Sequence, residues 1–484
     1  MLNPLGCFTC KSRHSRCDEK KPVCGNCLRL NLECKPSDFI APSAWNTIFE
    51  ASSSTQPETG AAAPLPIAPS PQASVLEGPP TSTWDVFRSH MQGLGLDLDD
   101  SPPMQHLLYS TLPTPGPTPD KPLPSGTVSL NPETAFLLQT FLQTVARWMD
   151  LFDHSLTYQL KVPPITLTCP LLFHCTCALA AKHLALARAS RNTSWTPISQ
   201  YHYGEALREL IETLNSPSRM NPSTLLTAIN LLSSYELMGS MGQEHRRHFL
   251  AEVSLIKSYS ICARSTGLDR ANFWIYVRHE IAVALATERP LLLSPEEWGV
   301  HWEDGERRED VLGNHVLWLL ARVINVVYGE EANTSIGRAM RNDLLQELEQ
   351  WRAGLSGSFI GVPYGDNDEE GFQRIYFTVP SAAAAAFWYH VTYILLYAEP
   401  VLQDAAYIPE IQRQAMKVTN IAISDFPDPV RVFATHGLYY AAKHIDGLAQ
   451  KARVWNILKD VENELGYHTR SVVKRLQDLV EQGI

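Results

Sequence analysis

Six cysteines crowd into the first part of the chain, and their spacing constrains this region more than any other feature of the sequence. They follow the pattern C-x2-C-x6-C-x6-C-x2-C-x6-C, so that a shift of seventeen residues maps the first three onto the last three. The six are Cys7, Cys10, Cys17, Cys24, Cys27 and Cys34. The N-terminal residues show no apolar secretory core, so we expect a reducing compartment, where clustered thiols are more often metal ligands than disulfides.

Coordination arithmetic predicts how many metal ions such a module holds. A structural zinc takes four tetrahedral ligands, with thiolates at about 2.3 Å. One zinc would leave two cysteines unused and break the duplication, whereas two zincs have eight ligand positions, which six thiolates fill when two of them bridge both metals. We therefore expect two Zn²⁺ per chain and a module, residues 1–37, that is unfolded without metal.

Charge is distributed unevenly along the chain. The net charge is −11, yet residues 1–37 carry seven Lys and Arg against three Asp and Glu. The basic residues of the first half are Lys11, Arg13 and Arg16 in the gap before Cys17, and Lys20 and Lys21 in the loop after it. The corresponding gap of the second half, between Cys27 and Cys34, holds Arg29 and Glu33 and is less basic. A small basic head on an acidic body is expected when one end of a chain contacts phosphate.

The run CFTCKSRHSRCDEKKPVCGNC at residues 7–27, followed by Cys34, resembles the fungal Zn(2)-C6 binuclear zinc cluster family. The resemblance implies a short first helix in the major groove of double-stranded DNA, reading a CGG-like triplet. It places Arg13 and His14 at base-reading positions, although that family usually has Lys or Arg where His14 stands. It places phosphate contacts at Lys11, Arg16, Lys20 and Lys21.

Residues 38–127 hold 16 of the 34 prolines and only two basic residues, which predicts a mostly disordered linker. Within it, Trp84–Phe87 and Leu94–Asp100 alternate apolar and acidic residues, so they are either an acidic activation segment or solvated linker. Residues 38–60 show no heptad repeat. We therefore expect that any homodimer forms through the helical body, or that the module binds DNA as a monomer.

From residue 128 the pattern becomes helical. Asn131-Pro132 and Asn221-Pro222 each combine a capping side chain with a proline at the first helical position. Apolar residues then recur on one face of a helix: Leu137, Phe141, Val145 and Trp148 in the first segment, and Leu225, Ile229 and Leu232 in the second. Ala- and Leu-rich segments continue at 268–290, 312–329, 338–353, 380–398, 408–424 and 430–483. With no period-two alternation and no hairpin signal, residues 128–484 are predicted to form a large all-α domain of a dozen or so helices.

This body resembles, more loosely, the fungal-specific transcription factor domain. The likeness covers roughly residues 130–450 and is carried by Trp148–Asp153, Cys169–His183 and Phe273–Arg278. It implies a regulatory domain common among regulators of metabolism, including secondary-metabolite gene clusters.

Several other features have simpler explanations than a site. Cys169, Cys175 and Cys177, beside His174, suggest a second metal centre, but i and i+2 positions face different sides of a helix, so we expect buried structural cysteines. The acidic run 366–370 is expected to be a solvated loop and the basic run 245–248 a helix surface. The apolar stretch 381–398 is expected to be a core helix, so no membrane partner is predicted.

We found no motif that supports catalysis, so an enzyme is the least favoured hypothesis. The leading one is a nuclear, RNA polymerase II-specific transcription regulator whose cluster selects the DNA site and whose body receives a signal or binds coregulators. The alternative is a zinc-stabilised interaction scaffold that does not bind DNA.

Overall fold

The computed structural model describes most of the helical body and part of the cysteine module. The described residues are 24–30, 34, 128–187, 195–215, 220–239, 245–398, 405–424 and 426–482. They belong to two units, one within residues 1–78 and one within residues 79–484. The predicted linker, 38–127, lies outside the described residues, so its disorder and its activation segment stay predictions.

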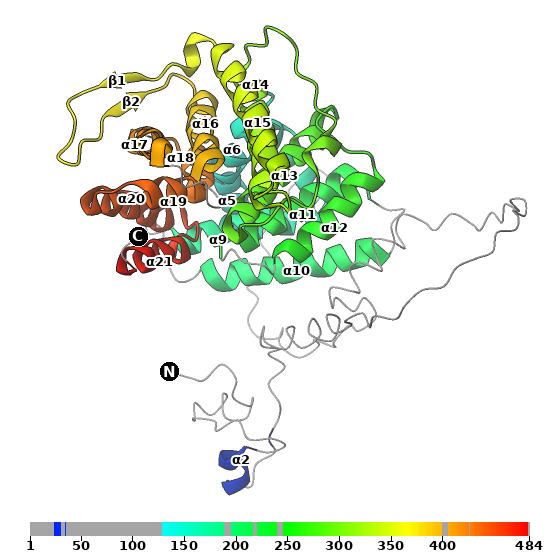
Figure 1. The fold of residues 1–484 in the computed structure, drawn as a ribbon. Coiled ribbons are helices and arrows are strands. Elements are labelled where there is room, and N and C mark those ends of the chain that lie inside the picture. Colours follow the sequence, from blue (N-terminus) through cyan, green and yellow to red (C-terminus); the bar gives the residue numbers. More distant parts are fainter. Residues whose placement is uncertain are drawn as a thin grey trace, which may run out of the picture. The chain divides into compact units, whose positions relative to one another are not determined.

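The body is built of helices, as predicted (Figure 1). Its longer helices are α5 (Pro132–Gln143), α9 (Pro170–Leu186), α10 (Trp195–Asn215), α11 (Pro222–Leu237), α12 (His245–Ser258), α13 (Gly267–Thr287), α14 (Glu309–Tyr328), α15 (Ser335–Ala353), α16 (Pro380–Ala398), α17 (Ile408–Ala422), α19 (Thr435–His444), α20 (Leu448–Asp460) and α21 (Arg470–Glu481). Short helical segments join them: α6 (Val145–Met149), η2 (Asp150–Phe152), α7 (Thr157–Leu160), α8 (Val162–Thr166), η5 (Pro295–Trp298), η6 (Gly357–Phe359), η7 (Ala405–Tyr407), α18 (Asp428–Phe433) and the π-helical turn η8 (Val461–Leu465).

Both predicted helix starts are confirmed. The Asn131 side chain accepts a hydrogen bond from the Thr134 N–H at 2.8 Å, and the Thr134 hydroxyl accepts one from the Asn131 N–H at 3.0 Å. At the start of α11, the Asn221 side chain accepts from the Ser223 N–H at 2.8 Å. These bonds satisfy backbone donors that a helix leaves without partners at its first turn. The predicted face continues across Thr144, where α5 passes into α6, and all four of its residues are buried.

The predicted core helix is confirmed, since α16 is buried along nearly its whole length. It packs against α14 on one side and against α17 and α19 on the others. The alanines at 382–386 are at most 4% exposed, and their small side chains let neighbouring helices approach closely. Among the described residues, α14 is the one helix long and apolar enough to cross a membrane. Of its most apolar 18-residue stretch, 67% is buried inside the fold.

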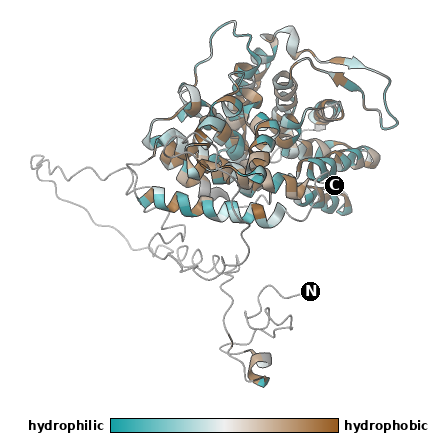
Figure 2. Ribbon diagram, turned by 180° about the vertical axis from the view of Figure 1, so that it is seen from behind, coloured by the Kyte–Doolittle hydropathy of each residue, from teal (hydrophilic) through white to brown (hydrophobic). Residues whose placement is uncertain are grey.

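The surface helix α10 shows how one face is buried. It lies beside α9, and its buried positions recur every third or fourth residue (Figures 1 and 2). Those buried residues are Ser199, His202, Ala206, Leu210 and Leu214. Polar residues occupy much of the remaining surface of the helix, the pattern of a helix with one side in the core and one in solvent.

The structure contains a short hairpin that the sequence did not predict. Strand β1 (Val362–Tyr364) pairs antiparallel with β2 (Arg374–Tyr376), with Val362 opposite Tyr376. Three-residue strands are too short to produce a visible alternation. The Ile375 N–H donates to the Ser424 hydroxyl at 2.6 Å, so the hairpin is held by the chain just beyond α17. The acidic run 366–370 lies within the connection between the strands and is mostly exposed, as expected.

The segment 430–483 is divided among α18, α19, α20, η8 and α21. The boundary between η8 and α21 lies at Gly466, which ends η8 with φ +74°. This left-handed conformation favours glycine, and a Cβ there would also lie 2.7 Å from the Leu186 Cβ. The conformation of this glycine therefore separates η8 from α21.

Two helical glycines allow a matched test of packing. A Cβ on Gly437 in α19 would lie 2.4 Å from Phe387 Cε1 and 2.9 Å from Val391 Cγ2, whereas one on Gly204 in α10 would meet nothing within 4 Å. We expect Gly437→Ala to lower the free energy of unfolding by about 1–3 kcal/mol. Gly204→Ala should raise it by about 0.5–1 kcal/mol, because alanine restricts the unfolded chain. Urea denaturation of the two variants checks this, and equal effects would contradict the close packing of α19 on α16.

Candidate metal centre

The second half of the cysteine module contains a short helix, α2 (Gly25–Arg29), that begins directly after Cys24. The Leu28 N–H donates to the Cys24 carbonyl at 2.9 Å, which closes the turn. Residues three apart lie on the same side of a helical turn, so Cys24 and Cys27 face the same way. Each is 1% exposed, whereas Leu28 is 72% exposed, so the two cysteines are shielded from solvent while Leu28 is not.

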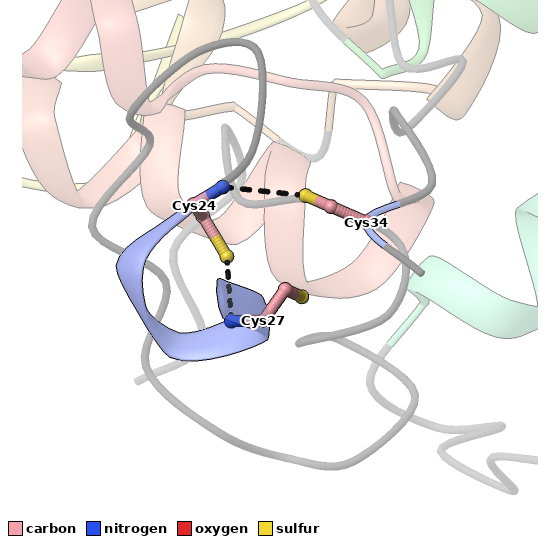
Figure 3. A group of neighbouring side chains, drawn as sticks. All are labelled: Cys24, Cys27 and Cys34. Atoms are coloured by element: carbon pink, nitrogen blue, oxygen red, sulfur yellow. Dashed lines mark hydrogen bonds between the residues drawn. The ribbon is translucent and has the colours of Figure 1, made fainter. Parts of the chain in front are cut away.

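Cys34 returns to this pair after the six-residue gap. The Sγ atoms of Cys24, Cys27 and Cys34 all lie within 4.8 Å of one another (Figure 3). The Cys24 N–H donates to the Cys34 sulfur at 3.4 Å, and the Cys27 N–H donates to the Cys24 sulfur at 3.4 Å. These two hydrogen bonds orient the sulfurs of Cys34 and Cys24, and the thiolate is the form of cysteine that binds metal.

The three sulfurs fit a tetrahedral zinc. With bonds of about 2.3 Å, two thiolates on one zinc lie roughly 3.8 Å apart. Three sulfurs within 4.8 Å of one another therefore occupy three corners and need only small movements to close on an ion. The fourth corner calls for another thiolate, and the thiolates of the first half are the predicted source.

The first half of the module lies outside the described residues. This applies to Cys7, Cys10 and Cys17, to the predicted base-reading residues Arg13 and His14, and to the predicted phosphate contacts Lys11, Arg16, Lys20 and Lys21. Their roles stay predictions.

The second cysteine cluster is structural, as predicted. Cys175 and Cys177 lie on α9 and are at most 1% exposed. Burial raises the pKa of Cys177 to about 12 and raises that of Cys175 well above its usual value, so both remain protonated thiols rather than thiolates. Among the residues that the structure describes, the group around α2 is the one set of three or more ligand-type side chains close enough to hold a metal.

A pocket in the helical body was not predicted from the sequence. It is a partly open depression of about 620 Å³, a volume that includes solvent at its mouth, and it is lined by residues of α6, α9, α11, α13, α18 and α19 together with Met238 and Tyr467. Arg278 is one of its polar residues, and it donates hydrogen bonds to the carbonyls of Trp148 and Met149. Burial lowers the pKa of Arg278 to about 10. No local pattern marks such a pocket, because its walls come from distant parts of the chain.

Comparison with known proteins extends this description. The model of the fungal Zn(2)-Cys(6) binuclear cluster domain matches residues 5–41, and the model of the fungal specific transcription factor domain matches residues 136–348. Transcription activator AMTR1 of Alternaria alternata is 20% identical over an alignment that includes all of this chain and 94% of that protein.

Other relatives match over short stretches. Sterol uptake control protein 2 of Candida albicans is 62% identical over 29 residues, which are 6% of this chain and 4% of that protein. Oleate activated transcription factor 3 of Eremothecium gossypii is 54% identical over 39 residues, which are 8% of this chain and 5% of that protein. No solved structure matches the chain.

Proposed function

Because the chain is a fungal transcription regulator that carries a Zn(2)-Cys(6) cluster domain and is not an enzyme, we propose that its first 37 residues hold two zinc ions and read a CGG-like triplet in double-stranded DNA. The helical body, residues 128–484, receives a signal or binds coregulators and provides any homodimer contact. The protein acts in the nucleus on genes transcribed by RNA polymerase II, which belong to a metabolic or secondary-metabolite set.

The single observation that carries the proposal is the convergence of Cys24, Cys27 and Cys34. The first half repeats the same spacing, so each half supplies three sulfurs. Two tetrahedral zincs then share two bridging thiolates. When bound, the metal supplies the folding free energy of a module too small for its own core.

The internal repeat also supports the position of the DNA-reading residues. The shift of seventeen residues maps Leu28 onto Lys11 and Leu30 onto Arg13. Leu28, in the last turn of α2, and Leu30, just beyond it, are 72% and 44% exposed. If the first half repeats this turn, Lys11 and Arg13 extend outward, where a phosphate and a base edge are within reach.

The chemistry of the basic residues separates reading from anchoring. Arginine donates two hydrogen bonds to guanine O6 and N7, worth about 1–3 kcal/mol of discrimination. Histidine is a weaker, single-point donor near neutral pH, so His14 contributes less to the choice of base. Each phosphate contact from Lys11, Arg16, Lys20 or Lys21 adds affinity that is independent of sequence and sensitive to salt.

Two substitutions test this division. We expect Arg13→Ala in the full chain to lose preference among sites selected from a random DNA pool. The matched variant Lys20→Ala should weaken binding to all DNA sequences about equally. It should also flatten the dependence of log affinity on log salt by about one unit. Unchanged site preference in Arg13→Ala would contradict the base-reading assignment.

The scaffold alternative has one supporting observation, since Leu28 and Leu30 are exposed at positions where the first half of the repeat has the cations Lys11 and Arg13. It predicts no salt-dependent DNA affinity for the full chain. Gel shifts across a salt series distinguish it from the proposed function.

A further inference from the structure

A second pocket of the helical body differs from the first in the cations that line it. It is a partly open depression of about 680 Å³, a volume that includes solvent at its mouth, and its lining residues come from 149–161 and 265–278. Its large apolar lining residues, each at most 7% exposed, are Met149, Phe152 and Trp274. Its charged lining residues are the cations Lys161, Arg270 and Arg278 and the carboxylate Asp153. We call this depression the cationic pocket.

Two of the three cations in this pocket have no ionic partner. Lys161 and Arg270 form no ion pair with any of the residues that the structure describes. Arg278, in contrast, donates hydrogen bonds to two backbone carbonyls, and the Asp153 carboxylate accepts from two backbone N–H groups. Three cations against one carboxylate leave the pocket with an excess of positive charge, and two of those cations are available to an acidic partner.

The start of α13 adds to this positive charge. A Cβ on Gly267 would lie 3.3 Å from Lys161 Nζ, so this ammonium group lies against the first residue of the helix. The N-cap residue Thr266 makes no side-chain hydrogen bond that caps the helix, and Asp269 is the one acidic residue of the first turn. The N-terminus of a helix carries about half a positive charge, so cations placed beside it repel it. An anionic group in the pocket would relieve this repulsion.

A segment of the same chain has the complementary composition. Residues 94–100 read Leu-Gly-Leu-Asp-Leu-Asp-Asp, with three leucines, three aspartates and no cation. In an extended backbone successive side chains point to opposite faces, so the leucines would share one face and Asp97 and Asp99 the other. Apolar and acidic faces match an apolar pocket with cations. The segment 84–87 matches less well, because its single acidic residue is closely followed by Arg88.

The chain enters the body close to this pocket. The Val128 N–H donates to the Leu167 carbonyl at 2.9 Å, directly after α8, and Lys161 directly precedes that helix. Since a helix rises about 1.5 Å per residue, this entry point and the pocket are about one short helix apart. Residues 101–127 join the acidic segment to the entry point and span up to roughly 90 Å when extended. A segment tethered in this way has an effective concentration on the order of 1 mM.

We propose that residues 94–100 of this chain dock in the cationic pocket. The three leucines contact its apolar lining, and the aspartates pair with Lys161 and Arg270. Docking removes residues 101–127 from the linker between the cysteine module and the body, and therefore shortens the reach of that module. The occupant is thus a part of the chain itself, and the tether makes even a weak contact well populated.

A peptide added in trans tests the docking by competition. The probe is a fluorescein-labelled peptide of residues 91–101, and fluorescence anisotropy measures its affinity for full-length chains. Leu94→Ser, Leu96→Ser and Leu98→Ser together give an open-pocket variant, whose own segment no longer competes. We expect this variant to bind the peptide about tenfold more tightly than the wild type, as a contact of about 0.1 mM at an effective concentration of about 1 mM implies. A peptide with Asp97→Asn and Asp99→Asn should bind about fivefold more weakly.

Charge reversal in the open-pocket variant locates the contact. Arg270→Glu should weaken binding of the native peptide about tenfold. It should strengthen binding of a peptide with Asp97→Lys and Asp99→Lys, a gain that loss of folding would not produce. Arg289→Glu is the matched control, because Arg289 is exposed just beyond the other end of α13 and the net charge changes equally. This control should leave the affinity of both peptides unchanged.

Three results would overturn the proposal. Equal affinity of the native peptide for the wild type and the open-pocket variant would show that the segment does not occupy the pocket. Equal effects of Arg270→Glu and Arg289→Glu would show attraction to net charge alone. Thermal stabilisation of the chain by inorganic phosphate, without binding of the peptide, would assign the pocket to a free anion. Neither zinc nor DNA enters these measurements, so they are independent of the proposed function.

Discussion

Replacing Cys24 by serine is expected to abolish the metal-stabilised fold of the N-terminal module and, with it, site-specific DNA binding. The Cys24 sulfur lies within 4.8 Å of the sulfurs of Cys27 and Cys34 and accepts a hydrogen bond from the Cys27 N–H. With six thiolates filling eight ligand positions, no spare ligand replaces a lost one. Structural zinc contributes about 10–16 kcal/mol to the folding of such small modules, so losing one ligand removes most of the driving force.

Metal analysis and DNA binding of the full chain check this expectation. Wild-type protein should contain two zinc ions per chain, and Cys24→Ser at most one, with specific DNA affinity falling to the nonspecific level. The thermal transition of the helical body should not change. Cys262→Ser, a half-buried cysteine of the body, serves as the control and should keep both ions. Two zinc ions in Cys24→Ser would refute the six-ligand assignment, and one ion in the wild type would refute the bridged pair.

The helical body is expected to lose stability steeply as pH falls from about 6.5 towards 4. Seven described histidines of the body have lowered pKa values, chiefly because burial disfavours the charged ring, and in five of them the shift is large. The pKa is lowered to about 4 for His202 and His315, and to about 3 for His279, His390 and His436.

The sign follows from proton binding in the two states. Below the ordinary histidine pKa of 6.5, the unfolded chain binds a proton at each of these five side chains, whereas the folded chain does not until pH 3–4. Each histidine therefore lowers the free energy of unfolding by up to about 1.4 kcal/mol per pH unit in this window. Their sum competes with the whole stability of a domain, about 5–15 kcal/mol.

One carboxyl acts in the opposite direction. Burial raises the pKa of Asp150 from 3.8 to about 6, so between these values the folded chain binds a proton that the unfolded chain does not. Asp150 thus favours the folded state as the pH falls through this window, and loses that contribution as the pH rises through 6. A single group offsets only part of the effect of five histidines, so the net result is destabilisation by acid.

Urea denaturation at a series of pH values, followed by tryptophan fluorescence, measures this slope. His315→Phe is the informative variant, because the His315 ring stacks on Trp302 with centroids 4.2 Å apart, a contact that phenylalanine preserves. The substitution removes one titrating group and should reduce the slope by up to about 1.4 kcal/mol per pH unit. An identical slope in His315→Phe would show that this ring does not stay neutral in the folded protein.

Local features were predictable from the sequence because their causes lie within a few residues. Zinc ligation depends on the spacing of cysteines along the chain, and the convergence of Cys24, Cys27 and Cys34 agrees with that spacing. The capping residues Asn131 and Asn221 act on the first turn of their own helices, so both helix starts were identified. Apolar periodicity likewise indicated which residues of α5 and α6 are buried.

The sequence by itself determined a cysteine module of metal-binding spacing followed by a helical body with known buried faces. Only the tertiary structure decided which helices meet, because periodicity indicates that a face is buried but not what covers it. The burial of α16 between α14 and α19 is one example, and the meeting of Lys161 with Arg270 at one pocket is another. Whether a charged side chain has a partner depends on neighbours from distant parts of the chain, and these come together only when the chain folds.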